Sequence, residues 1–183
     1  MTVEKETIRL ARLDDVPAIM RLIEASVREL QADDYSPAQR EGALGAVFGV
    51  DQQLIRDGTY FVAEVDGELV GCGGWSRRRT LFGADTAAQR DDAALVPGVD
   101  PARIRAFFIA PSYARRGLGT RLLAGCESAA REFGFDDLQL GATLTGLKLY
   151  ARHGYRPGIT EAVPLPNGAT LEIVHMHKSF APV

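Results

Sequence analysis

The chain has 183 residues, 46% of them hydrophobic and 25% charged, a balance typical of one globular domain with a sizeable core. Its formal net charge of -3 provides no overall field that attracts nucleic acid or an anionic membrane, so we expect neither as a partner. No apolar stretch approaches the roughly 20 residues of a membrane helix, and the polar start MTVEKETIRLARLDD lacks the apolar segment of a signal peptide, which favours a cytoplasmic protein.

In the first part of the chain the apolar pattern changes from strand-like to helical and back. Apolar and polar residues alternate at 7–13, as in a half-buried strand, and apolar residues recur at helical spacing after the candidate N-cap Asp14. Asp66-Gly67 separates two β-rich runs and is a strong hairpin signal. We therefore expect a strand at 7–13, helices at 14–30 and 36–50, and antiparallel strands at 59–65 and 68–75.

Between residues 77 and 100 the periodicity fails, and glycine, aspartate, alanine and proline dominate. A loop of this length inside a compact domain is usually a lid, a binding loop or disordered. The rest of the chain is again periodic. The pattern predicts a strand at 102–110, a helix at 116–133, a strand at 136–141, a helix from the N-cap Thr143 to Gly154, and a closing hairpin of 158–165 and 169–177. No repeat or linker divides this order, so we expect residues 1–183 to form a single domain.

The stretch PSYARRGLGTRLL joins the strand at 102–110 to the next helix. Gly117 and Gly119 lack a Cβ, so they permit unusual dihedrals and the close approach of a ligand. The free amides and positive dipole end of the helix start form an anion site, to which Arg115 and Arg116 add charge. The pattern indicates a phosphate-like ligand, with an ordinary tight turn as the alternative. It lacks the Lys-Ser/Thr of a nucleoside triphosphate loop and the third glycine of a dinucleotide fingerprint.

The stretch AFFIAPSYARRGLGTRLL, followed one strand later by LKLYARHGY, resembles the GNAT superfamily of acyl-CoA-dependent N-acetyltransferases. That family has an apolar strand with a Val-x-Pro-like end, then Gln/Arg-x-x-Gly-x-Gly/Ala, and later Leu-Tyr-x-x-x-Gly-Tyr/Phe. The specific motifs lie at 104–120 and 143–155, and the order of elements over 7–177 fits as well. The resemblance implies an α+β fold with a mixed, largely antiparallel sheet of about seven strands and about four helices. It also implies an enzyme that transfers acetyl from acetyl-CoA to a primary amine of a small molecule or peptide by direct attack in a ternary complex.

The resemblance implies a role for each part of the two motifs. Backbone groups of Phe107, Phe108 and Ile109 would bind the pantetheine and polarise the acetyl carbonyl. Tyr150 would act as the general acid for the departing thiolate. Main-chain amides would hold the pyrophosphate of coenzyme A, and these belong to Arg115, Arg116, Gly117, Leu118, Gly119 and Thr120. Ala114 departs from the family, which usually has Gln or Arg there, but the main-chain donors should limit the loss.

The sequence leaves the general base and the acceptor open. Many relatives carry Glu on the strand before the glycine turn, whereas this strand has Arg103 and Arg105 and no carboxylate. A water chain and Glu64 are the two alternatives for the base. By alternation Arg105 shares a strand face with Phe107 and Ile109, so it would suit a carboxylate- or phosphate-bearing amine. The alternative for Arg105 is a structural ion pair.

Further aromatic residues and the histidines complete the sequence-based hypotheses. Trp75, Tyr35 and Phe82 could wall the acceptor pocket, although ordinary packing also explains them. His175 and His177 lack a third ligand nearby, so we expect no metal site. A non-catalytic acyl-CoA-binding or sensing domain is the alternative function. The acyl chain length and the oligomeric state, for which a homodimer is one option, are left open.

Overall fold

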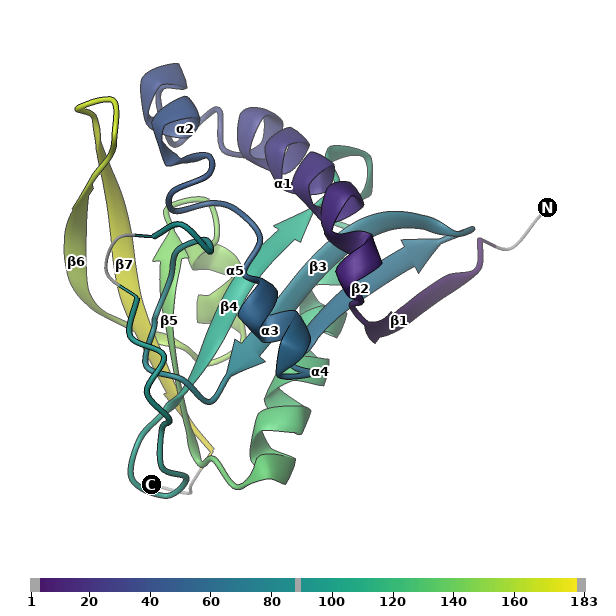
Figure 1. Cartoon of the computed structure of the whole chain (residues 1–183), viewed down its shortest axis with the longest axis vertical. Helices are drawn as coiled ribbons and strands as arrows, with labels where there is room; N and C mark the ends of the chain where they lie inside the picture. Colours follow the sequence, from purple (N-terminus) through teal and green to yellow (C-terminus); the bar gives the residue numbers. More distant parts are fainter. Residues whose placement is uncertain (1–3, 88–89, 181–183) are drawn as a thin grey trace.

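The computed structural model describes residues 4–87 and 90–180, and a seven-stranded sheet runs through its centre (Figure 1). The strand order is β1-β2-β3-β4-β5-β7-β6, and all neighbours are antiparallel except the parallel pair β4 and β5. The strands are β1 Glu6–Leu10, β2 Tyr60–Val65, β3 Glu68–Ser76, β4 Ala102–Ile109, β5 Asp137–Thr143, β6 Arg156–Pro164 and β7 Thr170–Ser179. The expected mixed, largely antiparallel sheet is confirmed.

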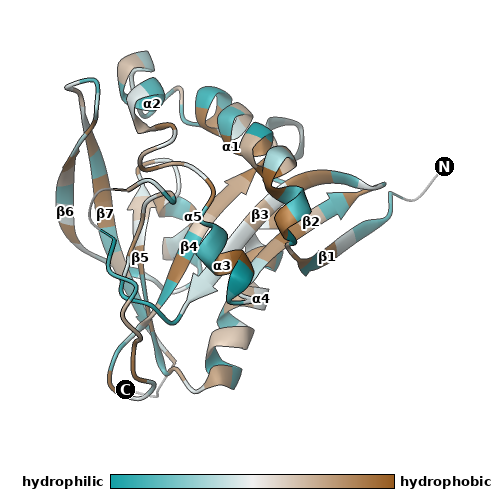
Figure 2. Cartoon of the chain, in the orientation of Figure 1, coloured by the Kyte–Doolittle hydropathy of each residue, from teal (hydrophilic) through white to brown (hydrophobic). Residues whose placement is uncertain are grey.

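Five α-helices in the described part of the chain cover the two faces of this sheet. The first three lie on the face turned to the viewer in Figure 1 and the other two lie behind it. They are α1 Val16–Leu30, α2 Pro37–Ala43, α3 Gln52–Arg56, α4 Leu118–Phe133 and α5 Leu147–Arg152. Short 3-10 turns at Leu13–Asp15 and Pro111–Tyr113 precede α1 and α4. Figure 2 shows hydrophobic and hydrophilic residues alternating around α1, as expected for a helix with one buried side.

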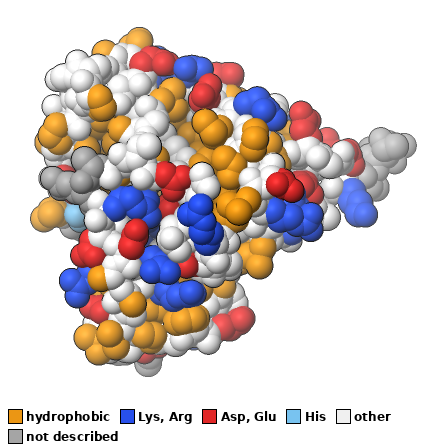
Figure 3. All heavy atoms as spheres, viewed as in Figure 1, with side chains coloured by type: hydrophobic (Ala, Val, Ile, Leu, Met, Phe, Trp, Pro, Cys, Tyr) orange, Lys and Arg blue, Asp and Glu red, His pale blue; other side chains and the backbone are white. Residues whose placement is uncertain are grey.

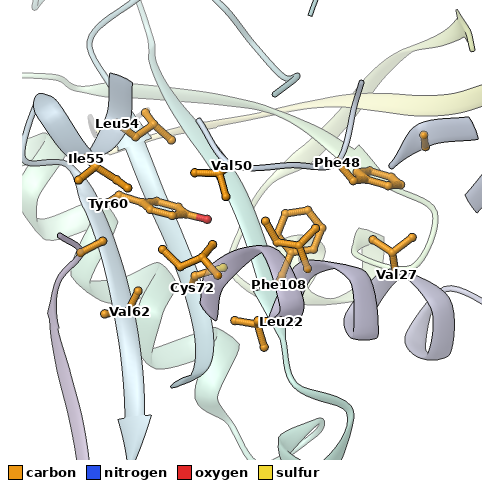
Figure 4. Close-up of a cluster of buried hydrophobic side chains, with 14 of the residues drawn as sticks. Leu22, Val27, Phe48, Val50, Leu54, Ile55, Tyr60, Val62, Cys72 and Phe108 are labelled. Atoms are coloured by element: carbon orange, nitrogen blue, oxygen red, sulfur yellow. The ribbon is translucent and has the colours of Figure 1, made fainter. Parts of the chain in front are cut away.

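Two main buried clusters hold the helices to the sheet. On the α1 side, Ile19 and Ile23 pack against Tyr60, Cys72 and Phe108 of the strands, and Figure 4 shows the last three side chains in this layer. On the other side, residues of α4 and α5 pack against β4, β5 and β7. Burial of apolar surface is the main stabilising contribution in both layers.

The helix expected at 36–50 is instead two short helices joined by a bend. The first ends at Ala43, because Leu44 is extended and Gly45 has φ +83°, a left-handed conformation that a right-handed helix cannot include. Asp51 then starts α3 by accepting a hydrogen bond from the main-chain N–H of Gln53 at 3.0 Å. The sequence pattern missed this second start, which is important for the site.

The described part of the 77–100 segment folds back on itself. Arg78 and Ala94 form an isolated antiparallel bridge. The main-chain N–H of Thr80 donates to the carbonyl of Asp91 at 2.9 Å, and that of Leu95 donates to Arg77 at 2.7 Å. Leu95 is buried in the cluster that includes Trp75. Residues 88 and 89 lie outside the described ranges.

The surface carries charges of both signs in close alternation. Figure 3 shows acidic and basic side chains interspersed on the viewed face, around a group of hydrophobic ones near its centre. None of the helices within residues 4–87 and 90–180 has the length and apolar character needed to cross a membrane.

Candidate active site

The site lies where the central sheet opens. The parallel strands β4 and β5 pair only at Ala102 with Leu138 and at Arg103 with Gln139. Beyond these pairs they separate toward their carboxyl ends, as Figure 1 shows. Strands that separate in this way leave main-chain groups and side chains free to line a binding site between them.

The glycine turn lies at the carboxyl end of β4 and leads into α4. Arg115 has φ +61° and Gly117 has φ +79°, so left-handed residues alternate along the turn. Such alternation points successive N–H groups toward one side, which forms an anion-binding concavity. The N–H groups from Arg115 to Thr120 donate to no other described residue. With the positive end of the 16-residue helix α4 added, the turn is suited to a phosphate group.

The side chains of the turn also form contacts of their own. Arg116 lies over the ring of Tyr113 at 4.9 Å. Arg121 pairs with Glu6 at 2.6 Å, which connects α4 to β1. The ring Nε2 of His153 lies 3.1 Å from Thr120 Oγ1. The sequence reasoning overlooked this histidine, although it stands inside the LKLYARHGY motif.

A cavity of about 210 Å³ extends from the turn along β4. Gly119 of the turn, Tyr150 of α5 and the strand residues Phe107, Phe108 and Ile109 all line it. A Cβ on Gly119 would lie 3.3 Å from Leu149 Cδ2, across this end of the cavity. The structure therefore brings the two sequence motifs together around one space.

A bulge in β4 determines which side chains face this space. Ala106 has φ +56°, and the pairing of β3 with β4 shifts register between Cys72 and Gly74. The hydroxyl of Tyr60 donates to the carbonyl of Ala106 at 3.0 Å. Because of the extra residue, simple alternation fails. Phe107 packs with the α4 and α5 layer, whereas Arg105 pairs with Asp51 on the α1 side, so the expectation of a shared face was wrong.

Tyr150 is buried beside two other aromatic rings. It is 8% exposed, and its ring lies edge-on to Phe107 at 6.3 Å and to Tyr155 at 5.7 Å. Its hydroxyl bonds to no other described residue, whereas that of Tyr155 donates to Glu127 at 2.9 Å. Burial raises the pKa of Tyr150 above its usual value, so the hydroxyl keeps its proton at neutral and alkaline pH.

Arg105 lines the cavity, but its guanidinium is already engaged. It pairs with Asp51 at 2.9 Å and donates to the carbonyls of Thr80 at 3.1 Å and Gly83 at 2.8 Å. Asp51 is 1% exposed and also pairs with Arg90 at 3.2 Å. This arrangement is the structural ion pair that the sequence left open as the alternative for Arg105.

Three of the other candidates lie away from the cavity. The hydroxyl of Tyr35 donates to the carbonyl of Glu172 at 2.7 Å and accepts from Leu144 N–H at 2.9 Å, and burial raises the pKa of this tyrosine to about 12. Trp75 packs near Phe133 and Phe135 behind the sheet. Glu64 pairs with Arg9 on β1. None of the three is among the residues that line the cavity.

The sequence reasoning overlooked several residues that do line the cavity. Ser26 comes from α1, Gln31 follows the end of that helix, and Phe48 comes from the bend between α2 and α3. Phe82, which the sequence did suggest, lines it from the 77–100 segment. Helical spacing predicted an amphipathic α1, but it could not tell which of its buried residues line the cavity and which pack in the core. None of the described lining residues carries a carboxylate.

The comparisons with known proteins agree with this geometry. Residues 24–155 match the family model described as the acetyltransferase (GNAT) family. No curated protein matches the chain at a significant level.

Solved structures of similar fold cover nearly the whole chain. A GCN5-related N-acetyltransferase from Rhodopseudomonas palustris has a TM-score of 0.70 and 22% identity, with 98% of each chain covered. The PaiA N-acetyltransferase from Thermoplasma acidophilum, solved with coenzyme A, has a TM-score of 0.62 and 13% identity, covering 96% of this chain and 99% of that one. A ribosomal-protein-alanine N-acetyltransferase from Brucella melitensis has a TM-score of 0.62 and 20% identity, covering 94% and 99%. At these identities the likeness concerns the fold.

Proposed function

The chain belongs to the acetyltransferase (GNAT) family, and from this premise we propose that it transfers an acetyl group from acetyl-CoA to a primary amine within a ternary complex. One observation carries the proposal. The N–H groups from Arg115 to Thr120 donate to no described residue, and Gly119 of this turn lines a cavity that continues along β4 to Tyr150. In this arrangement the diphosphate of acetyl-CoA would lie at the turn, and its thioester would lie along β4 near Tyr150.

In this proposal the protein binds the nucleotide end of acetyl-CoA through main-chain donors. The amides of the turn hold the pyrophosphate, and Gly117 and Gly119 let it approach closely. Backbone groups from Phe107 to Ile109 hold the pantetheine and polarise the acetyl carbonyl. Thr120, with His153 beside it, lies at the same end of α4.

The chemical step requires an uncharged amine and a proton for the leaving sulfur. The amine nitrogen attacks the acetyl carbonyl carbon, forming the C–N bond while the C–S bond breaks. Tyr150 gives its proton to the thiolate and regains one from solvent. The proton released by the amine passes to water, since no described lining residue offers a carboxylate and Glu64 lies outside the cavity.

The lack of a carboxylate among the described lining residues also favours a second candidate function, a binding domain without enzymatic activity. A domain that binds acyl-CoA without turning it over would need the same turn and the same cavity but no base. The test is to mix the protein with acetyl-CoA and a panel of primary amines, following thiol release and the mass of the acetylated amine. Acetylated product supports the enzyme, whereas binding of acetyl-CoA without product from any amine supports the sensing domain.

A further inference from the structure

The electrostatic character of the cavity wall bears on which amine it receives. Arg105 is the one formally charged side chain among its described lining residues. Its charge is balanced by Asp51 at 2.9 Å, and it is 3% exposed. Because a buried charge with its partner in place has little left to offer a ligand, the described residues of the wall present no free cation and no anion.

The rest of the wall is largely apolar and comes from four separate parts of the chain. These residues are Leu30, Val47, Phe48, Leu81, Phe82 and Ile173. The ring of Phe82 closes against β5 only because residue 141 is glycine, since a Cβ there would lie 2.8 Å from Phe82 Cδ1. The wall is therefore shaped for contact with a flat or branched hydrocarbon group.

The polar lining on the α1 side is neutral, and one group in it has no partner. Ser26 and Gln31 are each 5% exposed. The Oε1 atom of Gln31 is buried and accepts no hydrogen bond from any described residue. Ser26 and Gln31 are both uncharged, so the α1 side of the wall adds no charge to the cavity.

We propose that the acceptor is a primary amine on an uncharged, mainly apolar body, such as an aromatic ring. This inference rests on the proposed function and names its acceptor class. An acceptor with a carboxylate, a phosphate or a second ammonium group would bury a charge opposite a neutral wall, which disfavours binding. The wall thus selects uncharged acceptors over charged ones because its described residues offer no charge that would compensate theirs.

Four amines that share a primary amino group test this class. Phenethylamine and phenylalanine amide have uncharged bodies, phenylalanine adds a carboxylate to the same ring, and cadaverine carries a second ammonium group. We expect kcat/KM for the two uncharged amines to exceed that for the two charged ones by about tenfold or more. Equal or reversed preference overturns the inference.

A change of charge at one lining position makes the test sharper. Gln31→Glu keeps the side-chain shape and adds a carboxylate to the wall, so at about pH 8.5 it should raise kcat/KM for cadaverine relative to phenethylamine by about tenfold. Gln52→Glu makes the same change at the start of α3, outside this cavity, and should leave the ratio as in the wild type. An unchanged ratio in Gln31→Glu counts against the proposal.

The affinities of the four amines for the protein saturated with coenzyme A, measured by calorimetry, separate this inference from the proposed function. A preference for uncharged amines in binding supports the inference even if no amine is acetylated, in which case the proposed function alone fails. Turnover or binding that favours the charged amines overturns the inference and leaves acetyl transfer standing.

Discussion

Among single residues, Tyr150 is the one whose chemistry is tested most directly. We expect Tyr150→Phe to lower kcat by about 100-fold or more, the usual contribution of a positioned general acid, with little change in affinity for coenzyme A. Because burial raises the pKa of Tyr150, wild-type kcat should show no decline from loss of this proton up to about pH 10.

Tyr155→Phe is the matched control for that prediction. The Tyr155 hydroxyl donates to Glu127 at 2.9 Å and not into the cavity. The control should therefore keep wild-type kcat. Steady-state kinetics of the two variants over a range of pH measures both effects, and a kcat for Tyr150→Phe within threefold of wild type would argue against the acid role.

The second single-residue prediction concerns Arg105 and the stability of the protein. Arg105→Ala leaves Asp51, which is 1% exposed, with Arg90 alone at 3.2 Å. Removing one partner of a buried pair should lower the free energy of unfolding by about 3 kcal/mol. Urea denaturation measures it, and Arg28→Ala, in an exposed pair with Glu41, should change stability far less. Equal losses in the two variants would contradict a structural role for Arg105.

At the scale of elements, the proposed function assigns coenzyme A binding to the glycine turn with the start of α4. Gly117 has φ +79°, a conformation that a β-branched residue adopts only with strain. We expect Gly117→Val combined with Gly119→Val to reduce the affinity for coenzyme A by more than about 100-fold while the far-ultraviolet circular dichroism stays native.

Gly125 offers a control on the same helix. It lies in the middle of α4, and a Cβ there would meet no atom within 4 Å. Gly125→Ala should keep the affinity for coenzyme A and stabilise the protein by about 1 kcal/mol, since alanine is the better helix former. Calorimetric titration compares the two proteins. Unchanged affinity in the double valine variant would remove the basis for phosphate binding at the turn.

For the whole molecule, the separation of β4 from β5 makes stability depend on the ligand. Coenzyme A bound between the strands would contact both halves of the sheet, so binding should stabilise the folded state. At a concentration about 100 times Kd it adds about 2.7 kcal/mol, which for a domain of this size raises Tm by about 5–10 °C. Thermal denaturation with and without coenzyme A checks this. No rise in Tm, or the same rise in the double valine variant, would contradict it.

The elements near the two motifs could be predicted from sequence because their signals are local. Gly134 ends α4 with φ +110°, as its place after the apolar stripe suggests. Asp51 shows the opposite case. It caps α3 and pairs with Arg105, 54 positions further along, and no local pattern indicates such a pairing. Trp75 is likewise a residue type that often lines ligand pockets, but its position on β3 directs its side chain toward Phe133 and Phe135.

By itself the sequence determined the family, the order of the strands, the order of the helices apart from α3, and the position of the glycine turn, because these follow from motif spacing and local backbone preference. The tertiary structure alone decided which side chains meet around the cavity. The bulge at Ala106 separates the faces of Arg105 and Phe107, and the pairing of Arg105 with Asp51 leaves the described lining residues of the cavity without free charge. Contacts between distant segments depend on how the sheet bends and packs, and that information is spread over the whole chain.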